Sequence, residues 1–225
     1  MNIDADNHVI VRSLGLQPYE QVWQRMKDFT DARTASSIDE IWLLQHESVF
    51  TLGQAGKVEH LLSPGNIPII KSDRGGQVTY HGPGQLIAYL MINLRRRGLG
   101  VRNLVTQIEK ALMGLLAELG VDAQVRDKAP GVYVNNQKIA SLGLRVRKNC
   151  TFHGLSLNMA MDLSPFSRIN VCGYEGLQVT QLSDLLSEVN AEQVNELLID
   201  HLKNRLGYTQ HQTLYGWSEE TNVGN

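Results

Sequence analysis

Cys172 is the side chain of this sequence best suited to chemistry, because it lies in a polar, glycine-rich segment, C-G-Y-E-G. A thiolate is a strong nucleophile, and the apolar spacing of residues 180–189 predicts a helix whose N-terminus would stabilise a nearby anion. A lone cysteine is more often a small buried hydrophobic residue, and Cys150, which follows the polar turn Lys148–Asn149, fits that role. The glycine-rich surroundings of Cys172 instead favour a nucleophile.

Lys138 is the second candidate for chemistry. It follows a predicted hairpin turn at Asn135–Asn136 and begins the apolar segment K-I-A-S-L-G. A lysine at a strand end is usually solvated, but one that enters a core is costly unless it has a partner or a task. His81 and His153 are the other residues that could act as a base beside a cysteine. Sequence separation alone leaves a Cys–Lys pair and a Cys–His pair both open.

A glycine-rich stretch, R-G-G-Q-V-T-Y-H-G-P-G-Q, begins at Arg74 and leads into an apolar strand predicted over residues 86–94. Its glycines indicate backbone that takes positive φ or lets a ligand approach closely. Donors and polar side-chain tips stand between the glycines, namely Arg74, Thr79, Tyr80, His81 and Gln85. The stretch therefore predicts either a polar hairpin or a loop that binds a ligand along its backbone.

Composition excludes several classes of protein. The chain has 225 residues, of which 42% are hydrophobic and 20% charged, so a sizeable core is expected and disorder is not. A net charge of −2 argues against general binding of nucleic acid, and two cysteines imply no disulfide framework. No apolar run reaches the roughly 18 residues of a membrane span, and residues 1–8 lack a secretory signal. These features together predict a cytoplasmic protein. No spacing of residues suits a metal site, so we expect no metal.

Periodicity and turn signals predict an α+β fold in a single domain over residues 1–225, with a mixed or antiparallel sheet flanked by helices. The predicted strands cover residues 9–11, 40–45, 49–53, 66–71, 86–94, 142–147 and 152–159, and residues 131–141 are predicted to form a β-hairpin. The predicted helices cover residues 19–29, 103–119, 180–189 and 194–206, with Gly120 placed to end the second.

Four segments together resemble one enzyme family over about residues 35–205. They are the R-G-G-x-x-T-(aromatic)-H-x-x-G-Q pattern from Arg74, K-I-A-S-L-G-L-R-V, F-H-G-L-S-L-N, and R-I-N-V-C-G-Y. The family is that of the octanoyl-[acyl-carrier-protein]:protein N-octanoyltransferases. The resemblance implies the α+β catalytic core shared with biotin and lipoate protein ligases.

The resemblance also implies which residues catalyse the reaction and which contact the substrate. Matching positions make Cys172 and Lys138 a catalytic dyad, and no cofactor is implied. The implied substrate contacts are Arg74, Gly75, Gly76, Gln77, Val78, Thr79, Tyr80, His81, Ser141, Leu142, Gly143, Gly154, Leu155 and Ser156. The family commonly has proline before the catalytic cysteine, where this chain has Val171, which lowers the expected stiffness of the loop.

The implied activity is transfer of an octanoyl or lipoyl group from acyl carrier protein to a lysine, through a cysteine thioester and without ATP. The implied acceptors are lipoyl domains of 2-oxoacid dehydrogenase complexes and the glycine cleavage H protein, and we expect a monomer. An ATP-dependent lipoate or biotin protein ligase and a non-catalytic acyl-carrier-binding module are the alternatives.

A basic cluster, Arg95–Arg97 with Arg102, is predicted either to attract the acidic carrier or to be an ordinary solvated face. Arg145, Arg147 and Lys148 could extend this cluster.

Overall fold

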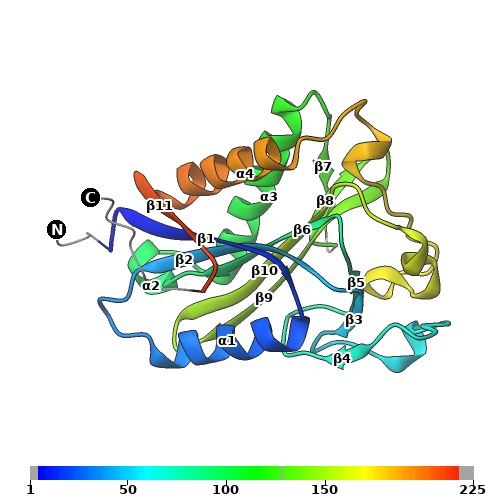
Figure 1. The fold of residues 1–225 in the computed structure, drawn as a ribbon, viewed down its shortest axis with the longest axis horizontal. Helices are drawn as coiled ribbons and strands as arrows, with labels where there is room; N and C mark the ends of the chain where they lie inside the picture. The colour runs from blue at the N-terminus through cyan, green and yellow to red at the C-terminus, as the bar shows by residue number, and fades with distance from the viewer. Residues whose placement is uncertain (1–4, 128, 218–225) are drawn as a thin grey trace.

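The structure is a computed structural model that describes residues 5–127 and 129–217, and its main element is a mixed sheet (Figure 1). This sheet has eight strands in the order β11-β1-β2-β6-β10-β9-β8-β7. The strands are β1 (His8–Gln17), β2 (Asp39–His46), β6 (Gln85–Met91), β7 (Gln124–Val125), β8 (Gly131–Val134), β9 (Gln137–Arg147), β10 (Cys150–Asn158) and β11 (Gln210–Tyr215). The β1 strand pairs in parallel with β2 and β11, and the other pairs are antiparallel.

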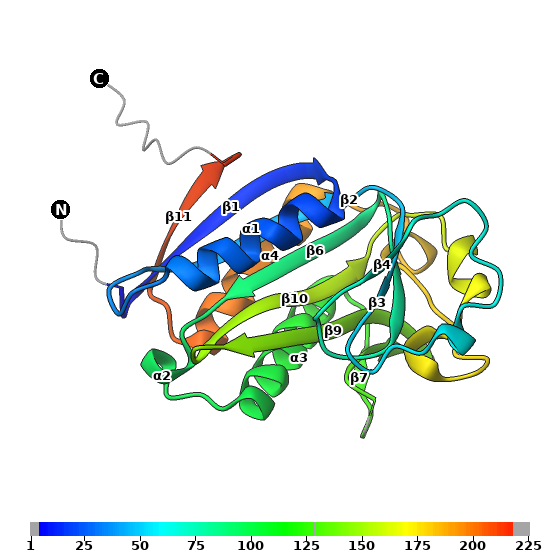
Figure 2. The same cartoon turned by 90° about the horizontal axis from the view of Figure 1, so that it is seen from below.

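Helices cover both faces of the large sheet (Figures 1 and 2). The α-helices are α1 (Tyr19–Ala32), α2 (Leu94–Arg97), α3 (Val101–Glu118) and α4 (Ala191–Leu206). The α1 helix packs on one face through Val22 and Met26, whereas α3 and α4 bury leucines such as Leu112 and Leu198 against the other face. None of the described helices is long and apolar enough to cross a membrane.

A second, smaller sheet lies beside one end of the large sheet (Figure 1). It has three strands in the order β4-β3-β5. They are β3 (Val49–Leu52), β4 (Ile69–Lys71) and β5 (Val78–His81). The strand predicted over residues 66–71 is therefore confirmed only for its last part, because Pro68 lacks the N–H that a ladder needs.

The glycine-rich loop that precedes β5 lies directly against the backbone of β9 in the large sheet. The N–H of Gly75 donates to the carbonyl of Leu144 in β9 over 3.1 Å. A Cβ atom at Gly143 would lie 2.9 Å from the Gly75 carbonyl oxygen, so any side chain there would push the loop away from β9. The glycines thus hold the loop before β5 close against the large sheet.

Several sequence predictions are confirmed by the structure. The mixed sheet with flanking helices is present, and α1, α3 and α4 lie where apolar spacing placed helices. Asn135 and Asn136 take φ values of 47° and 67°, as their hairpin turn requires. Gly120, just after α3, has φ of 78°.

The helix predicted over residues 180–189 is wrong. Only a 3-10 turn, Leu182–Asp184, forms there. The N–H of Thr180 donates to the Lys138 carbonyl over 3.0 Å, and the N–H of Ser183 donates to the Met159 carbonyl over 2.9 Å. The Ser183 N–H is thereby taken from the bond to residue 179 that a helix over 180–189 would form, and Thr180 is held against β9, so the local apolar spacing does not decide the structure.

Candidate active site

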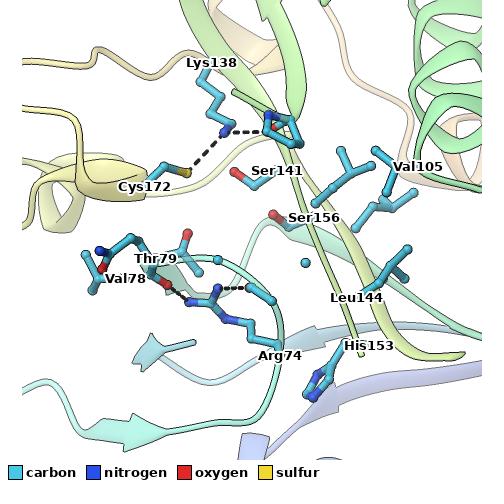
Figure 3. A pocket seen from close by; sticks show the side chains of 18 of the residues that line it. Arg74, Val78, Thr79, Val105, Lys138, Ser141, Leu144, His153, Ser156 and Cys172 are labelled. Carbon is cyan, nitrogen blue, oxygen red and sulfur yellow. Dashed lines mark hydrogen bonds between the residues drawn. The ribbon is translucent and has the colours of Figure 1, made fainter. Parts of the chain in front are cut away.

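Lys138 and Cys172 form the centre of the site (Figure 3). The Nζ of Lys138 donates to the Sγ of Cys172 over 3.1 Å. Lys138 is the second residue of β9, and the segment after Cys172 runs alongside it: the N–H of Lys138 donates to the Gln178 carbonyl over 2.9 Å. The chain that follows Cys172 is thus tied to the strand that carries Lys138. Of the two pairs that the sequence left open, the structure forms the Cys–Lys pair.

Lys138 is held in place by burial and by one backbone acceptor. Its side chain is among the largest fully buried ones, at 2% exposed, and its Nζ also donates to the Pro130 carbonyl over 2.9 Å. Within the described parts of the chain, no carboxylate forms an ion pair with this ammonium. A buried charge without an opposite charge is costly, and the sulfur of Cys172 is the side-chain atom hydrogen-bonded to this Nζ.

Cys172 sits in a strained turn and not before a helix. It lies inside a 3-10 turn, Val171–Gly173, with φ of 56° and ψ of 19°. The expectation that a helix N-terminus stabilises its thiolate is therefore wrong, since the next α-helix begins only at Ala191. The turn is fixed by hydrogen bonds from the Gly173 N–H to the Asn170 carbonyl, 2.8 Å, and from Tyr174 to Val171, 3.0 Å. A left-handed residue held in this way is typical of functional sites.

The histidines proposed as alternative bases are occupied elsewhere. His81 shares a 2.7 Å hydrogen bond between its Nδ1 and Gln85 Oε1. His153, which has φ of 59°, places its Nε2 2.9 Å from the Asp73 carboxylate. Burial, above all other causes, lowers the pKa of both imidazoles below the usual 6.5. They are therefore neutral near pH 7, and neither is hydrogen-bonded to Cys172.

His81 and His153 belong to a buried cluster of histidine and tyrosine rings next to the cavity. His46 Nε2 lies 2.6 Å from the hydroxyl of Tyr89, and its ring is 5.9 Å from that of His81. Desolvation lowers the pKa of His46 to about 4. Tyr19 stacks on His81 at 6.1 Å, and burial raises the pKa of Tyr19 to about 12. At neutral pH the imidazoles and phenols of this cluster are uncharged.

Arg74 clamps the glycine-rich loop from within. Its guanidinium donates to the Thr51 hydroxyl at 2.9 Å and to the carbonyls of Thr51, Gly75 and Gln77. The side chain is buried, and desolvation lowers the pKa of this guanidinium from its usual value. All of these acceptors are neutral, so Arg74 fixes the loop and leaves a positive charge close to the cavity wall.

A cavity of about 370 Å³ opens beside the dyad. Every predicted substrate contact except Tyr80 lines it. Tyr80 points away because strand residues alternate: Thr79 and His81 face the cavity, while the Tyr80 hydroxyl lies 3.0 Å from the Ser48 hydroxyl, on the other side. Tyr80 packs in the core of the small sheet and makes no contact with the cavity.

Part of the cavity wall was missed by the sequence analysis. It consists of apolar and aromatic residues from other elements, namely Ile87, Tyr89, Val101, Val105, Ala129, Pro130, Leu144 and Tyr174. Val101 and Val105 stand four residues apart on α3, outside the apolar stripe that faces the sheet. That spacing was the one available signal, since apolar residues next to a core stripe often line a pocket.

Comparison with known proteins places this chain in a family. Residues 18–203 match the lipoyl protein ligase A/B catalytic domain. An octanoyltransferase of Stutzerimonas stutzeri is 58% identical over 93% of this chain and 95% of that protein. One of Klebsiella pneumoniae is 56% identical over 92% of this chain and 97% of that protein.

Solved structures show the same fold at low sequence identity. A putative lipoate protein ligase of T. acidophilum with bound lipoic acid has a TM-score of 0.72 at 16% identity, over 93% of this chain and 90% of that one. A biotin protein ligase of Aquifex aeolicus has a TM-score of 0.55 at 10% identity, over 89% and 68%. The expected core shared with lipoate and biotin ligases is thus confirmed. The chain belongs to the family of the lipoyl protein ligase A/B catalytic domain and, within it, to the octanoyltransferases, which are acyltransferases.

Proposed function

We propose that the chain transfers an octanoyl or lipoyl group from acyl carrier protein to a lysine of a lipoyl domain, through a thioester on Cys172 and without ATP. The observation that carries this proposal is the 3.1 Å contact between the Lys138 ammonium and the Cys172 sulfur at the wall of a largely apolar cavity. The relatives named octanoyltransferase support the choice of acyl group.

In the first half-reaction, the Cys172 thiolate attacks the carbonyl carbon of the carrier's thioester. A free thiol is mostly protonated at neutral pH. The side-chain Nζ of Lys138 donates to Sγ, and this charge-assisted hydrogen bond favours the thiolate. The bond between the carbonyl carbon and the carrier sulfur then breaks. The departing thiolate takes a proton from Lys138, which leaves an octanoyl thioester on Cys172 and a neutral amine on Lys138.

In the second half-reaction, the lysine amine of the acceptor attacks the Cys172 thioester. Neutral Lys138 takes the proton of the attacking amine, and Cys172 leaves as a thiolate beside the restored ammonium. The amide formed is more stable than the thioester consumed, so transfer runs forward. Because the donor is already activated, no step consumes a nucleotide.

The cavity is proposed to seat the acyl chain. Val105 from α3, Leu144 from β9 and Leu155 from β10 give it apolar walls, and the bare backbone of Gly75 and Gly143 lets an extended chain lie close. We assign substrate contact to the predicted residues that line the cavity, and not to Tyr80. The chain is proposed to act as a monomer in the cytoplasm, where Cys172 stays a free thiol. Its acceptors are proposed to be lipoyl domains of 2-oxoacid dehydrogenase complexes and the glycine cleavage H protein.

Mass spectrometry after mixing with octanoyl carrier protein, without ATP, tests the proposal. The expected result is an octanoyl adduct on Cys172 that disappears when a lipoyl domain is added, and no adduct in Cys172→Ala. An ATP-dependent ligase would instead need free octanoate and ATP and leave Cys172 unmodified. A carrier-binding module would bind the carrier and acquire no adduct. Either result would overturn the proposal.

A further inference from the structure

Three hydroxyl groups from different strands face the cavity next to the thiol. They belong to Thr79 in β5, Ser141 in β9 and Ser156 in β10. Ser141 and Ser156 are direct partners in the β9–β10 ladder, so their side chains stand side by side on one face of the sheet. Figure 3 shows the three hydroxyls turned toward the space beside the Cys172 sulfur.

These hydroxyls are unused by the protein itself. The Oγ1 of Thr79 is buried and has no hydrogen-bond partner in the part of the chain that the structure describes. The hydroxyls of Ser141 and Ser156 line the cavity, and neither is hydrogen-bonded to another described residue. Thr79 is only 6% exposed and Ser156 only 5%. A buried hydroxyl such as that of Thr79 costs free energy unless a ligand or water satisfies it, and the hydroxyls of Ser141 and Ser156 are free to bind the same polar ligand atom.

An acyl thioester brings one suitable polar atom to this place, its carbonyl oxygen. The rest of the octanoyl group is hydrocarbon, which matches the apolar remainder of the wall. The backbone of the cysteine turn offers less, because the N–H groups of Gly173 and Tyr174 already donate to the carbonyls of Asn170 and Val171. Donors that are fixed before the reaction and aimed at developing charge are the most effective form of transition-state stabilisation.

We propose that the hydroxyls of Thr79, Ser141 and Ser156 bind the thioester carbonyl oxygen and stabilise the oxyanion in both half-reactions. This inference rests on the proposed function. When the Cys172 thiolate forms its bond to the carbonyl carbon, the carbonyl π pair moves to oxygen, and the hydroxyls donate to that oxyanion. The pair returns when the bond to the carrier sulfur breaks. The same oxygen becomes charged again when the acceptor amine attacks and discharges when the bond to Cys172 breaks.

Single-turnover acylation of Ser141→Ala, Ser156→Ala and Thr79→Val by octanoyl carrier protein tests the proposal. Removing one oxyanion donor typically lowers the rate by about 10²- to 10³-fold, and we expect losses of that order with little change in KM. Ser141→Thr and Thr79→Ser keep a hydroxyl and should recover most of the rate. Ser48→Ala, whose hydroxyl bonds to Tyr80 outside the cavity, is the matched control and should acylate like the parent.

Alkylation of Cys172 by iodoacetamide separates this role from a structural one. Alkylation forms no oxyanion, so the variants should alkylate as fast as the parent while their acylation falls. Equal losses in both reactions would show that the hydroxyls only shape the site, and unchanged acylation would show that they do not bind the oxyanion. Both results overturn this inference alone. The proposed function fails separately, if the parent itself acquires no octanoyl adduct.

The stretching frequency of the thioester carbonyl tests the same proposal without a rate measurement. In the octanoyl-enzyme formed from octanoyl carrier protein labelled with ¹³C at the octanoyl carbonyl, hydrogen bonds from the hydroxyls weaken the carbonyl bond and lower its stretching frequency. Ser141→Ala and Ser156→Ala should shift that band to higher frequency, and Ser48→Ala should leave it in place. An unshifted band in both cavity variants would contradict the proposal.

Discussion

The side chain of Lys138 passes through the space that a side chain at residue 131 would fill. A Cβ atom on Gly131 would lie 2.5 Å from Lys138 Cε and 3.1 Å from its Nζ. Gly131 also has φ of +136°, a conformation that residues with a side chain rarely adopt. The start of β8 thus leaves open the path by which the lysine reaches Cys172.

Gly131→Ala should therefore displace the ammonium from the sulfur. We expect a loss of octanoyl transfer together with a loss of about 1–3 kcal/mol in the free energy of unfolding from backbone strain. Gly120→Ala is the control, because Gly120 has φ of +78° and nothing within 4 Å of its virtual Cβ. It should lose stability alone. Acylation rates and denaturant unfolding of both variants check this, and a Gly131→Ala protein with the parent's acylation rate would contradict it.

Substitution of each member of the dyad should block a different half-reaction. Cys172→Ser supplies an alcohol that Lys138 cannot appreciably ionise, so no acyl-enzyme should form. Lys138→Arg keeps a positive charge near the sulfur, so acylation should partly survive. Arginine is not deprotonated in proteins, so it cannot take the acceptor amine's proton, and octanoyl should accumulate on Cys172.

Mass spectrometry before and after addition of a lipoyl domain distinguishes the two variants. Transfer by Lys138→Arg at the parent's rate would show that another group accepts the proton. An unacylated Lys138→Arg protein would contradict the prediction from the other side, since it would mean that positive charge alone does not support the first step.

Local sequence patterns predicted much of this fold and site. The helical spacing of α3 and the turn residues Asn135–Asn136 act within a few residues, so they could be recognised before any tertiary contact was known. The glycines next to Arg74 signalled a close backbone approach, and the structure places Gly75 against β9.

The remaining features depend on contacts between distant segments. Residues 180–189 form a 3-10 turn in place of an α-helix because Thr180 and Ser183 bond to Lys138 and Met159, which apolar spacing does not reveal. The apolar wall formed by Val101 and Val105 becomes part of the cavity only once α3 packs on the sheet. The direction of Tyr80 was within reach, since strand alternation separates it from Thr79 and His81.

The free energy of unfolding should fall as pH drops below neutral because of the buried histidines. His46 has a pKa of about 4 when folded and about 6.5 when unfolded. Between these values the unfolded chain binds a proton that the folded chain excludes, so acid favours unfolding. The loss for His46 is on the order of 3 kcal/mol, and His81, whose pKa is also lowered, adds to it.

Chemical denaturation between pH 4 and pH 7 measures this effect, since the slope of unfolding free energy against pH counts the protons taken up. His46→Gln should be less stable at pH 7 and should show a shallower slope. His201→Gln is the control, because His201 is at the surface beside Glu118. A His46→Gln slope equal to the parent's would mean that His46 does not stay neutral in the folded chain.

Carrier docking should depend on fewer arginines than the basic cluster in the sequence suggests. Arg96 bonds to buried Asp39 at 2.6 Å, and Arg97 lies 4.5 Å from the ring centroid of Tyr208, so both are structural. Arg95 in α2 and Arg102 at the start of α3 are both exposed, and Arg102 follows Val101, which lines the cavity. These two are best placed to meet an acidic carrier.

A double substitution, Arg95→Gln with Arg102→Gln, should raise KM for the carrier several-fold at low salt. The difference from the parent should shrink as salt rises, because the screening length is only about 10 Å at 0.1 M. The double substitution Lys71→Gln with Arg205→Gln, at two other exposed basic residues, is the control for net charge. A KM for the carrier that changes neither with salt nor with the double substitution would rule out electrostatic docking at this face.

Acyl-chain preference should be set by the apolar wall that α3 contributes to the cavity. Val105 is half-buried and lines, with Leu144, the cavity of about 370 Å³, so a larger side chain there removes room that the far carbons of an octanoyl chain would occupy. Val105→Phe should therefore lower kcat/KM for octanoyl carrier relative to butyryl carrier. Each methylene bound in an apolar pocket is worth about 1–3 kcal/mol, so the ratio should change by at least about 10-fold.

Val101→Phe provides the matched comparison, because Val101 lies on the same helix but is 44% exposed at the rim. A phenylalanine there can turn toward solvent, and the chain-length ratio should change much less. Competition between octanoyl and butyryl carriers in one mixture, read by mass spectrometry of acylated Cys172, measures the ratio directly. If Val105→Phe keeps the parent's ratio, the acyl chain does not run along α3. It would then lie against the part of the cavity wall formed by Leu155 and Tyr89.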